Sequence, residues 1–310
     1  MAINMKGKNL VSIDDLSREE VAQILETAEI IKLRHYSQES QPILRGKVLG
    51  MIFQKPSLRT RVSFETGMMQ LGGEAIYLGP DDIKLGQREA IKDIAQVLSR
   101  YVNGIMARTF SHNIILELAK YSTVPVINGL SDLLHPCQIL GDLLTIREKK
   151  GRLSNLKLAY IGDGNNVAHS LMFGAVKVGM DIILATPNGY EPRSEIIEKT
   201  KEDAQKTGSK VEIIQDPVEA ANGADIIYTD VWTSMGFEKE SEIRKNVFKP
   251  YQVNQDLANK AKDDVIILHC LPAHRGEEIT DEVIDGPHSV VIDQAENRLH
   301  AQKAVLALLL

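Results

Sequence analysis

Val48-Leu-Gly-Met-Ile-Phe53 and Lys55-Pro-Ser-Leu-Arg-Thr-Arg61 are neighbouring stretches of the chain, an apolar run followed by a basic motif. The apolar run predicts a buried strand, and the segment from Val62 to Gly72 predicts a helix because its apolar residues fall on one face. The basic motif is therefore expected at a strand-to-helix turn. Such turns are the repeating unit of α/β folds.

The basic motif has the chemistry of an anion site. Backbone N–H groups at a helix start have no partner within the helix, and the helix dipole adds positive potential there. Ser57 and Thr60 add hydroxyl groups, and Arg59 and Arg61 add guanidinium groups that match phosphate oxygens in pairs. The motif predicts a phosphate site, although a basic helix start that makes surface ion pairs fits the same residues.

The composition is that of a globular protein. With 310 residues, one or two domains are expected, and 43% hydrophobic and 25% charged residues are ordinary values. The net charge of −6 gives no footprint for nucleic acid or an anionic membrane. The two cysteines, Cys137 and Cys270, are too few for a disulfide framework and favour a reducing cytoplasm. We see neither a signal peptide nor a run of roughly 20 apolar residues.

The first half of the chain alternates between helical and extended patterns. Ser17-Arg-Glu-Glu20 has the pattern of a capping box and predicts the start of an amphipathic helix. A polar loop is expected from Gly79 to Glu89, and Pro136 suits the first position of a helix. The other expected elements are strands at Ala75–Leu78, Gly104–Arg108 and Val124–Ile127, and helices at Ala90–Tyr101 and Asn113–Lys120.

The polar run Glu148–Asn155 marks the predicted domain boundary. A second series follows, with helices expected at Val167–Val178 and Glu191–Thr207. Its expected strands are Lys157–Ile161, Asp181–Ala185, Val211–Ile214, Asp225–Thr229, Val265–Leu268 and Ser289–Ile292. The alternation predicts an α/β protein with two doubly wound domains and parallel sheets. We assign 1–150 to the first domain, completed by a C-terminal helix at 295–310, and 151–294 to the second.

Polar clusters recur where predicted strands end. In open α/β sheets, ligands bind beyond the carboxyl ends of the strands, so this placement predicts a functional cleft between the two domains. The clusters are Lys55–Arg61, Arg108, His135-Pro-Cys-Gln138, Asp163-Gly-Asn-Asn166, Asp230-Val-Trp-Thr-Ser-Met-Gly236, His269-Cys-Leu-Pro272 and Glu296-Asn-Arg298.

Two other interpretations of these clusters are weaker. Gly162-Asp-Gly164 suggests a dinucleotide site, but Val167 stands where the full glycine pattern needs its third glycine. His135 with Cys137, and His269 with the adjacent Cys270, are metal-ligand types without the spacing of a zinc site. We therefore expect neither cofactor nor metal.

A phosphorylated small molecule on the basic motif would bring further side chains into use. Arg108, His135, Gln138 and Arg298 can surround the group beside the phosphate and stabilise charge on a carbonyl oxygen. Asp230, Asn166 and the backbone of Ser234-Met235 can hold an amine partner. No serine or cysteine triad indicates a covalent route, so direct transfer between two oriented substrates fits better.

Taken together, the motifs resemble the ornithine carbamoyltransferases of the aspartate/ornithine carbamoyltransferase family, in order and along the whole chain. The resemblance rests on Ser57-Leu-Arg-Thr-Arg61, Ala107-Arg-Thr-Phe110, His135-Pro-Cys-Gln138, Asp163-Gly-Asn-Asn166, Asp230 with Ser234-Met-Gly236, His269-Cys-Leu-Pro272 and Glu296-Asn-Arg298. It implies that carbamoyl phosphate and L-ornithine give L-citrulline and phosphate, in the cytoplasm and within arginine biosynthesis. It also implies a homotrimer or a multiple of trimers.

The resemblance implies site residues position by position. Carbamoyl phosphate would be held by Ser57, Leu58, Arg59, Thr60, Arg108, His135, Gln138, Arg298 and the backbone carbonyl of Leu271. Ornithine would be held by Asn166, Asp230, Ser234, Met235 and Cys270. Arg108, His135, Asp230, Cys270 and Arg298 would be the catalytic residues.

Two positions depart from the family pattern. Leu58 replaces the usual threonine, which matters little where the position serves through its backbone N–H. Lys84 stands in a loop that reaches a neighbouring subunit in the family, where ornithine enzymes usually have glutamine and aspartate enzymes have lysine. We expect Lys84 to touch the adjacent subunit's phosphate site.

Two alternatives remain at this point. One is a carbamoyltransferase for another amine, such as putrescine or an acetylated ornithine. The other is a protein that binds a phosphorylated metabolite or a nucleotide without catalysis.

Overall fold

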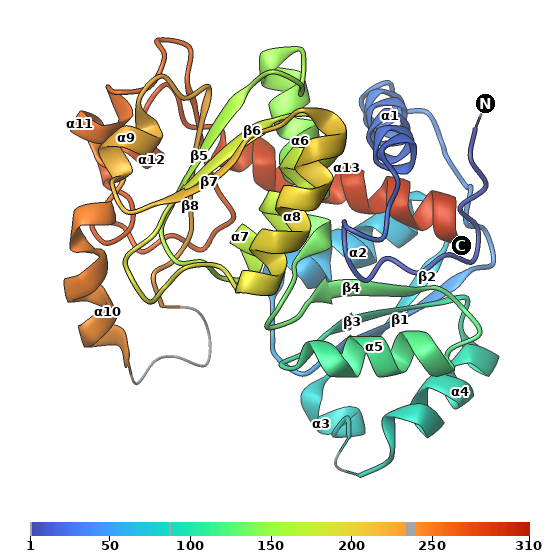
Figure 1. Ribbon diagram of the computed structural model, residues 1–310. Helices are drawn as coiled ribbons and strands as arrows, with labels where there is room; N and C mark the ends of the chain where they lie inside the picture. Colours follow the sequence, from blue (N-terminus) through green and yellow to red (C-terminus); the bar gives the residue numbers. More distant parts are fainter. Residues whose placement is uncertain (1, 87, 234–239) are drawn as a thin grey trace. The chain divides into compact units, whose positions relative to one another are not determined.

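The computed structural model describes residues 2–86, 88–233 and 240–310, which fold into two compact units (Figure 1). The first unit comprises Met1–Leu144 and Glu296–Leu310, and the second comprises Thr145–Ala295. The boundary at residue 145 falls inside one helix. Ser234 and Met235 lie outside the described residues.

The first unit contains a four-stranded parallel sheet in the order β2-β1-β3-β4. Its strands are β1 (Val48–Phe53), β2 (Glu74–Leu78), β3 (Gly104–Arg108) and β4 (Val126–Leu130). The helices associated with it are α1 (Arg18–Tyr36), α2 (Leu58–Gln70), α3 (Pro80–Ile83), α4 (Ile91–Tyr101), α5 (His112–Tyr121), α6 (Pro136–Lys150) and α13 (Val291–Leu309). The strand order reverses between β1 and β3, which makes the carboxyl end of this strand pair the expected ligand position.

The second unit contains a five-stranded parallel sheet in the order β7-β6-β5-β8-β9. Its strands are β5 (Lys157–Ile161), β6 (Asp181–Ala185), β7 (Val211–Ile214), β8 (Ile226–Thr229) and β9 (Ile266–His269). Its helices are α7 (Asn166–Lys177), α8 (Ser194–Thr207), α9 (Pro217–Ala221), α10 (Ser241–Phe248), the 3-10 helix η2 (Lys249–Tyr251), α11 (Gln255–Ala258) and α12 (Asp281–Ile284). Here the order reverses between β5 and β8.

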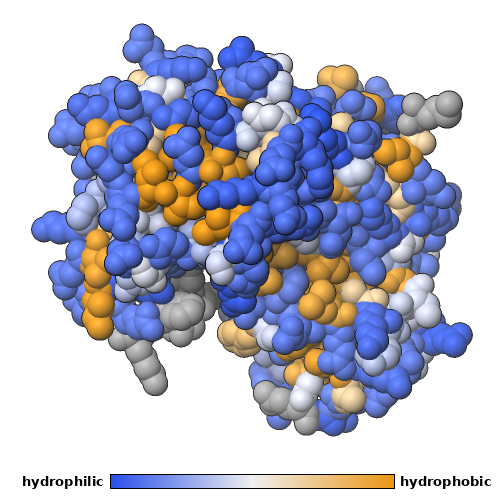
Figure 2. Space-filling view, viewed as in Figure 1, coloured by the Kyte–Doolittle hydropathy of each residue, from blue (hydrophilic) through white to orange (hydrophobic). Residues whose placement is uncertain are grey.

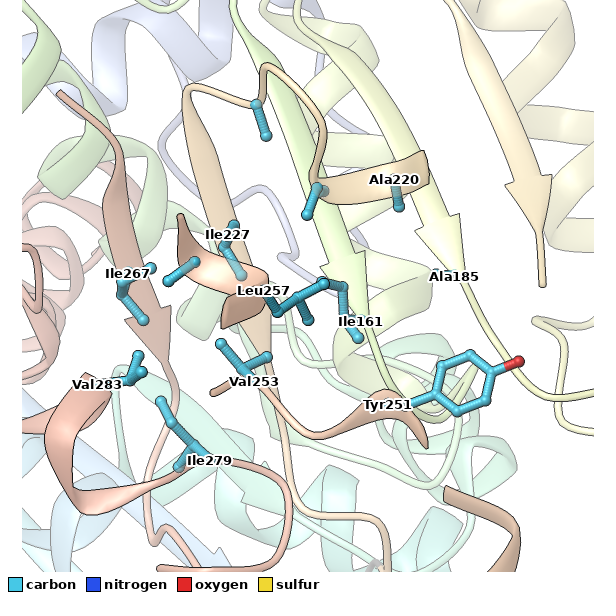
Figure 3. Close-up of a cluster of buried hydrophobic side chains, with 14 of the residues drawn as sticks. Ile161, Ala185, Ala220, Ile227, Tyr251, Val253, Leu257, Ile267, Ile279 and Val283 are labelled. Atoms are coloured by element: carbon cyan, nitrogen blue, oxygen red, sulfur yellow. The ribbon is translucent and has the colours of Figure 1, made fainter. Parts of the chain in front are cut away.

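Each unit has its own apolar core. In the first, α4 and α5 bring Ile94 and Ile115 against Ile52 and Ile105 of the sheet. In the second, Figure 3 shows side chains from β5, β8 and β9 meeting those of the short helices α11 and α12. Ile227, Ile267 and Val283 are among the residues that this cluster buries. The two cores fix the strands, and the strands fix the loops at their carboxyl ends.

The strand register places several predicted clusters at common edges. Phe53 at the end of β1 is paired with Arg108 at the end of β3. Ile161 is paired with Thr229, and Thr229 with His269, so β5, β8 and β9 end side by side. Because these are parallel strands, the residues that follow them start from the same edge of each sheet.

Most predicted elements are confirmed, many to the residue, including β1, β3, β5, β6 and β7. The capping box is also present: Ser17 accepts from the Glu20 N–H, and the Glu20 side chain accepts from the Ser17 N–H. The helix predicted at Val62–Gly72 starts earlier, at Leu58, because Ser57 already caps it. The basic motif thus forms the first helical turn.

Three other predictions were wrong. Ser289–Ile292 is not a strand: Ser289 forms an isolated bridge with Ile267, and the helix α13 already starts at Val291. The predicted loop at 79–89 contains the short helix α3. The strand expected at Val124–Ile127 runs from Val126 to Leu130 instead, where the Asn128 N–H donates to the Leu10 carbonyl.

Among the described residues, none of the helices combines the length and the hydropathy that crossing a membrane requires. On the face shown in Figure 2, hydrophilic residues cover most of the surface and hydrophobic residues form separate patches.

Candidate active site

The start of α2 is built to receive an anion. Ser57 adopts an extended conformation as the N-cap, and its hydroxyl accepts from the Thr60 N–H at 3.3 Å. The two hydroxyl oxygens of Ser57 and Thr60 are 3.2 Å apart. The Leu58 side chain is 76% exposed. Leu58 is the first residue of α2, so its backbone N–H is one of those that have no partner within the helix. These donors and the helix dipole favour a bound phosphate.

Lys55 places a buried ammonium beside this helix start. Its side chain follows β1, is 8% exposed, and lies 5.1 Å from the centre of the Phe110 ring. Burial is the largest cause that lowers the pKa of Lys55 to about 8; the nearby Arg108 acts in the same direction, and Asp132 opposes both. Because a second cation stands close by, a bound anion would stabilise both charges.

His135 lies within the same group of cations. It is 5% exposed, and burial is the largest cause that lowers its pKa well below the usual range. Arg298, Arg108, Lys55 and Arg59 act in the same direction, in that order. The imidazole is therefore neutral near pH 7, and one ring nitrogen carries a proton to donate. A neutral donor among four cations suits a carbonyl oxygen that gains negative charge.

Gln138 and Arg298 are joined by a buried hydrogen bond. Arg298, on α13, donates from Nη1 to Oε1 of Gln138 at 2.7 Å, and Gln138, in the first turn of α6, donates from Nε2 to Asp142 Oδ1 at 2.8 Å. Gln302 accepts from Arg298 Nη2 at 2.9 Å when its amide oxygen faces the guanidinium. That orientation follows because an arginine nitrogen can only donate.

Arg61 is engaged elsewhere. Its Nε donates to Glu65 Oε1 at 3.0 Å, and its guanidinium carbon lies 3.9 Å from the centre of the Tyr77 ring. Of the two arginines in the basic motif, Arg59 but not Arg61 is among the cations that act on His135. The interpretation as a surface ion pair thus fits Arg61, and the phosphate interpretation fits the helix start.

In the second unit, Asp230 is the centre of a hydrogen-bond group. It follows β8, is 5% exposed, and accepts from Asn165 Nδ2 at 2.8 Å, from the Val231 N–H at 2.8 Å and from the Cys270 thiol at 2.9 Å. A carboxylate has about four acceptor positions, so these bonds leave room for a donor from a ligand. Asn165 also caps α7, through Val167 and Ala168.

Asp163 follows β5 and forms a buried ion pair with Arg244 of α10, at 2.9 Å. Arg244 donates from the same nitrogen to the Trp232 carbonyl, also at 2.9 Å, and its Nε donates to Glu240 at 3.2 Å. Burial raises the pKa of Asp163 to about 6, against the influence of Arg244. This pair ties α10 to the end of β5 and to the segment that follows Asp230.

The loop after β9 is shaped by a buried pair, His269 and Glu278, both fully buried. The Leu271 N–H donates to His269 Nδ1 at 2.9 Å, so the ring proton is on Nε2, which lies 3.0 Å from Glu278 Oε1. Glu278 also accepts from the His274 N–H at 2.6 Å. These contacts hold Leu271 in a left-handed conformation, with φ of 56°, which is uncommon for a leucine.

Within the part of the chain that the structure describes, two groups of side chains have the composition of metal sites. Asp230, His269 and Cys270 place possible ligand atoms within 4.8 Å of one another, and so do His274, Glu277 and Glu278. Both ring nitrogens of His269 already have hydrogen-bond partners. A metal ion at the first group would have to displace one of them, so our expectation of no metal stays a prediction.

The structure brings together several predicted residues of the first unit and two of the second. In the first unit, Arg59, Arg108 and Arg298 act on His135, and Gln138 contacts Arg298. In the second, Asp230 contacts Cys270. Asn165, the N-cap of α7, donates to Asp230, and the predicted Asn166 is the first residue of that helix. Ser234 and Met235 lie outside the described residues.

Sequence reasoning did not select three residues that the structure places in these groups: Lys55, Asp142 and Asn165. Lys55 lies in the basic motif, but no role in binding the anion was predicted for it. Asn165 could have been found from its N-cap position before α7, whereas Asp142 has no motif of its own and is separated from Gln138 by one helical turn.

One unit gathers cations at a capped helix start, and the other holds an acid and a thiol beyond its strand ends. Such a protein can bind a phosphorylated donor and an amine acceptor, which are the needs of a group-transferring enzyme. Two family descriptions match the chain. Aspartate/ornithine carbamoyltransferase, carbamoyl-P binding domain, matches residues 8–148, and aspartate/ornithine carbamoyltransferase, Asp/Orn binding domain, matches residues 154–309. The chain belongs to the aspartate/ornithine carbamoyltransferase family.

Relatives match over nearly the full length. The chain is 55% identical over 310 residues to the ornithine carbamoyltransferase of Thermococcus kodakarensis, covering 100% of this chain and 98% of that protein. It is 58% identical over 308 residues to that of Halalkalibacterium halodurans, covering 99% and 97%. Among solved structures, the ornithine carbamoyltransferase from Pyrococcus furiosus has a TM-score of 0.97 at 55% identity, covering 99% of this chain and 98% of that one.

Proposed function

We propose that this protein is an ornithine carbamoyltransferase, which transfers the carbamoyl group of carbamoyl phosphate to the side-chain amine of L-ornithine. The products are L-citrulline and phosphate. Relatives that carry this name share more than half of its residues over the full chain. The observation that carries the proposal is the group of four cations around the neutral His135, beside the capped start of α2.

The phosphate group of the donor belongs at the start of α2. Ser57 and Thr60 supply hydroxyl groups, Leu58 supplies its backbone N–H, and Arg59 supplies a guanidinium. A charged, paired contact of this kind is stronger than a neutral hydrogen bond. Because four different donors converge on it, the phosphate is held in one orientation, which also fixes the direction of the bond that breaks.

The carbamoyl group belongs beside Arg108 and His135. The proton of the neutral imidazole and the Arg108 guanidinium are directed at the carbamoyl oxygen, where negative charge develops as the amine attacks. We assign the Gln138 oxygen and the Leu271 carbonyl to the carbamoyl nitrogen, and Arg298 to the same substrate. We assign 1–150 with 295–310 to a carbamoyl phosphate-binding domain and 151–294 to an ornithine-binding domain.

Ornithine belongs to the second unit. Asn166, Ser234 and Met235 hold the amino acid, while Asp230 and Cys270 organise its ends so that the side-chain amine is presented without its proton. The amine nitrogen forms a bond to the carbamoyl carbon, the bond from that carbon to the phosphate oxygen breaks, and the nitrogen releases its second proton. Neither a covalent enzyme intermediate nor a cofactor or metal ion takes part.

Further features belong to the same proposal. The reaction takes place in the cytoplasm as a step of arginine biosynthesis, consistent with Cys137 and Cys270 not being joined in a disulfide. The protein acts as a homotrimer or a multiple of trimers. Lys84, exposed at the end of α3, reaches the phosphate site of an adjacent subunit.

A substrate panel tests this proposal. Purified protein in metal-free buffer with a chelator is given carbamoyl phosphate and, separately, ornithine, putrescine, acetylated ornithine or aspartate. Ureido product from ornithine is expected, and activity should survive the chelator. Product from another amine alone would change the acceptor, and binding of NAD without any transfer would overturn the assignment.

The phosphate assignment has its own mutational test. Arg59→Ala should weaken carbamoyl phosphate binding about 10- to 100-fold, because one hydrogen bond to a charged group contributes about 1.5–3 kcal/mol. Arg61→Ala is the matched control, since Arg61 pairs with Glu65. Equal effects of the two substitutions would place the phosphate elsewhere.

A further inference from the structure

Asp142 is a fully buried carboxylate one helical turn after Gln138 on α6. It accepts from Gln138 Nε2 at 2.8 Å, and Gln138 Oε1 accepts from Arg298 Nη1 at 2.7 Å. Gln138 is 2% exposed and Arg298 is 3% exposed, so the chain of three side chains is shielded from water. Shielding strengthens both charge-assisted bonds.

The orientation of the Gln138 amide follows from its two neighbours. An amide group has a donor end and an acceptor end, a guanidinium can only donate, and an ionised carboxylate can only accept. With Asp142 on one side and Arg298 on the other, a single orientation satisfies both. The amide nitrogen faces Asp142, and the amide oxygen faces Arg298. A reversed amide would place two donors together at Arg298 and two acceptors together at Asp142.

We propose that Asp142 is a positioning residue that fixes this orientation, so that Gln138 presents an oxygen to the amino group of the carbamoyl substrate. The inference rests on the proposed function. The Gln138 oxygen has a second lone pair besides the one used by Arg298. It can accept an N–H from a carbamoyl group held beside Arg298. An acyl phosphate with a methyl group in that place, such as acetyl phosphate, has no N–H to give.

Asp142 therefore acts on substrate choice without touching the substrate. A site that is built to hydrogen-bond a donor rejects an analogue that lacks it, because the buried acceptor is left without its partner. If the amide were free to turn, the site would lose this preference. The phosphate contacts at the start of α2 would stay as they are.

The test compares three ligands on the wild-type protein and on Asp142→Asn: carbamoyl phosphate in fresh solution, acetyl phosphate and inorganic phosphate. Asparagine has nearly the shape of aspartate, but it can donate as well as accept, so only Arg298 still selects the orientation of the Gln138 amide. The preference is the dissociation constant of acetyl phosphate divided by that of carbamoyl phosphate. It should fall about 3- to 10-fold, the range of one neutral hydrogen bond. Binding of inorganic phosphate should stay within about twofold.

A swapped pair separates the orientation argument from a general loss of structure. In Gln138→Glu with Asp142→Asn, the asparagine donates to the glutamate, whose oxygens again face Arg298 as acceptors. All three anions should bind less tightly because the negative charge moves from position 142 to position 138, next to the ligand, but the preference for carbamoyl phosphate should return to near the wild-type value. This variant keeps the test valid even if Asp142→Asn alone is too unstable to purify.

Three results would overturn the inference: an unchanged preference in Asp142→Asn, a parallel loss of affinity for all three ligands, or a preference that stays low in the swapped pair. Failure of the proposed function looks different. In that case the wild-type protein itself would show no preference for carbamoyl phosphate and would form no citrulline.

Discussion

Lys55 and His135 show how burial prepares single residues for an anionic ligand. Both are basic, both are nearly buried, and burial is the first cause that lowers the pKa of each. The outcomes differ: His135 becomes a neutral donor, whereas the pKa of Lys55 falls to about 8 and leaves a cation that can lose its proton slightly above neutral pH. Arg108 and Asp132 are the other charged groups that act on Lys55.

Lys55 predicts a pH dependence of substrate binding. Below about pH 8 the amine is protonated and attracts the donor's phosphate, and above it the charge is lost. The dissociation constant of carbamoyl phosphate should therefore rise as the pH increases from 7 to 9. Isothermal titration at several pH values measures this. Lys55→Arg, which keeps the charge at all these pH values, should flatten the curve, and an unchanged curve would exclude Lys55 as its cause.

Lys84 predicts a contact between subunits. If Lys84 touches the phosphate site of a neighbour, Lys84→Gln should weaken carbamoyl phosphate binding and reduce its sensitivity to salt, because one positive charge is removed. Binding measured at several salt concentrations tests this. Lys120→Gln, a change at a lysine of α5, is the control. If affinity and salt dependence are the same in Lys84→Gln and wild type, Lys84 has no such contact.

At the scale of elements, helix starts carry much of the site. Ser57 begins α2, Asn165 begins α7, and each lies just beyond a strand end. Caps of this kind have a sequence signature, which is why the strand-to-helix turns could be predicted. The predicted start of α2 was nevertheless too late, because Leu58 and Arg59 were assigned to the basic motif and not to the helix.

Asn165 predicts a combined effect on stability and on the amine substrate. Asn165→Ala removes the α7 cap and the donor to Asp230. Urea denaturation should show a loss of about 1 kcal/mol, and the KM for ornithine should rise several-fold. Ser17→Ala is the matched control because it removes only the cap of α1. It should lower stability by a similar amount and leave KM unchanged. If both variants leave KM unchanged, Asn165 is a cap alone.

The buried carboxyl of Asp163, which pairs with Arg244, predicts a pH effect on stability. The folded pKa of Asp163 is about 6, above the ordinary value of 3.8, so between these values the folded chain holds a proton that the unfolded chain has released. This carboxyl therefore stabilises the fold most at low pH, and its contribution is lost as the pH rises through about 6. The expected loss is at most about 3 kcal/mol.

Asp163→Asn isolates that contribution. The difference in free energy of unfolding between wild type and variant should shift against the wild type as the pH is raised from about 4 to 6. Urea denaturation at several pH values, followed by tryptophan fluorescence, measures it. A constant difference would show that Asp163 has the same pKa in the folded and unfolded chain.

At the scale of the whole molecule, the alternation of apolar runs with amphipathic segments was sufficient to predict the α/β class. Strands buried on both faces have a clear signature, and β1, β3 and β5 were predicted to the residue. Ser289–Ile292 was mistaken for a strand because a short apolar run does not distinguish a strand from a buried helix start. Sequence separation hid other features: Arg298 and Gln138 lie 160 residues apart in the chain, and only the fold joins them.

The predicted site residues were found from motifs at strand ends, and their roles came from the resemblance. The sequence could not predict the protonation of the basic side chains or the orientation of the amide side chain. The neutral His135, the weakened proton affinity of Lys55 and the fixed amide of Gln138 all depend on burial and on neighbours from other elements. Such properties follow from the packed structure and not from any local pattern.

The most direct measurement is citrulline formation by the purified protein from carbamoyl phosphate and L-ornithine, with release of phosphate followed in the same sample. We expect one phosphate per citrulline, no product when ornithine is omitted, and a severe loss of carbamoyl phosphate affinity in Arg59→Ala. Absence of citrulline from a folded protein that still binds inorganic phosphate would contradict the proposed function.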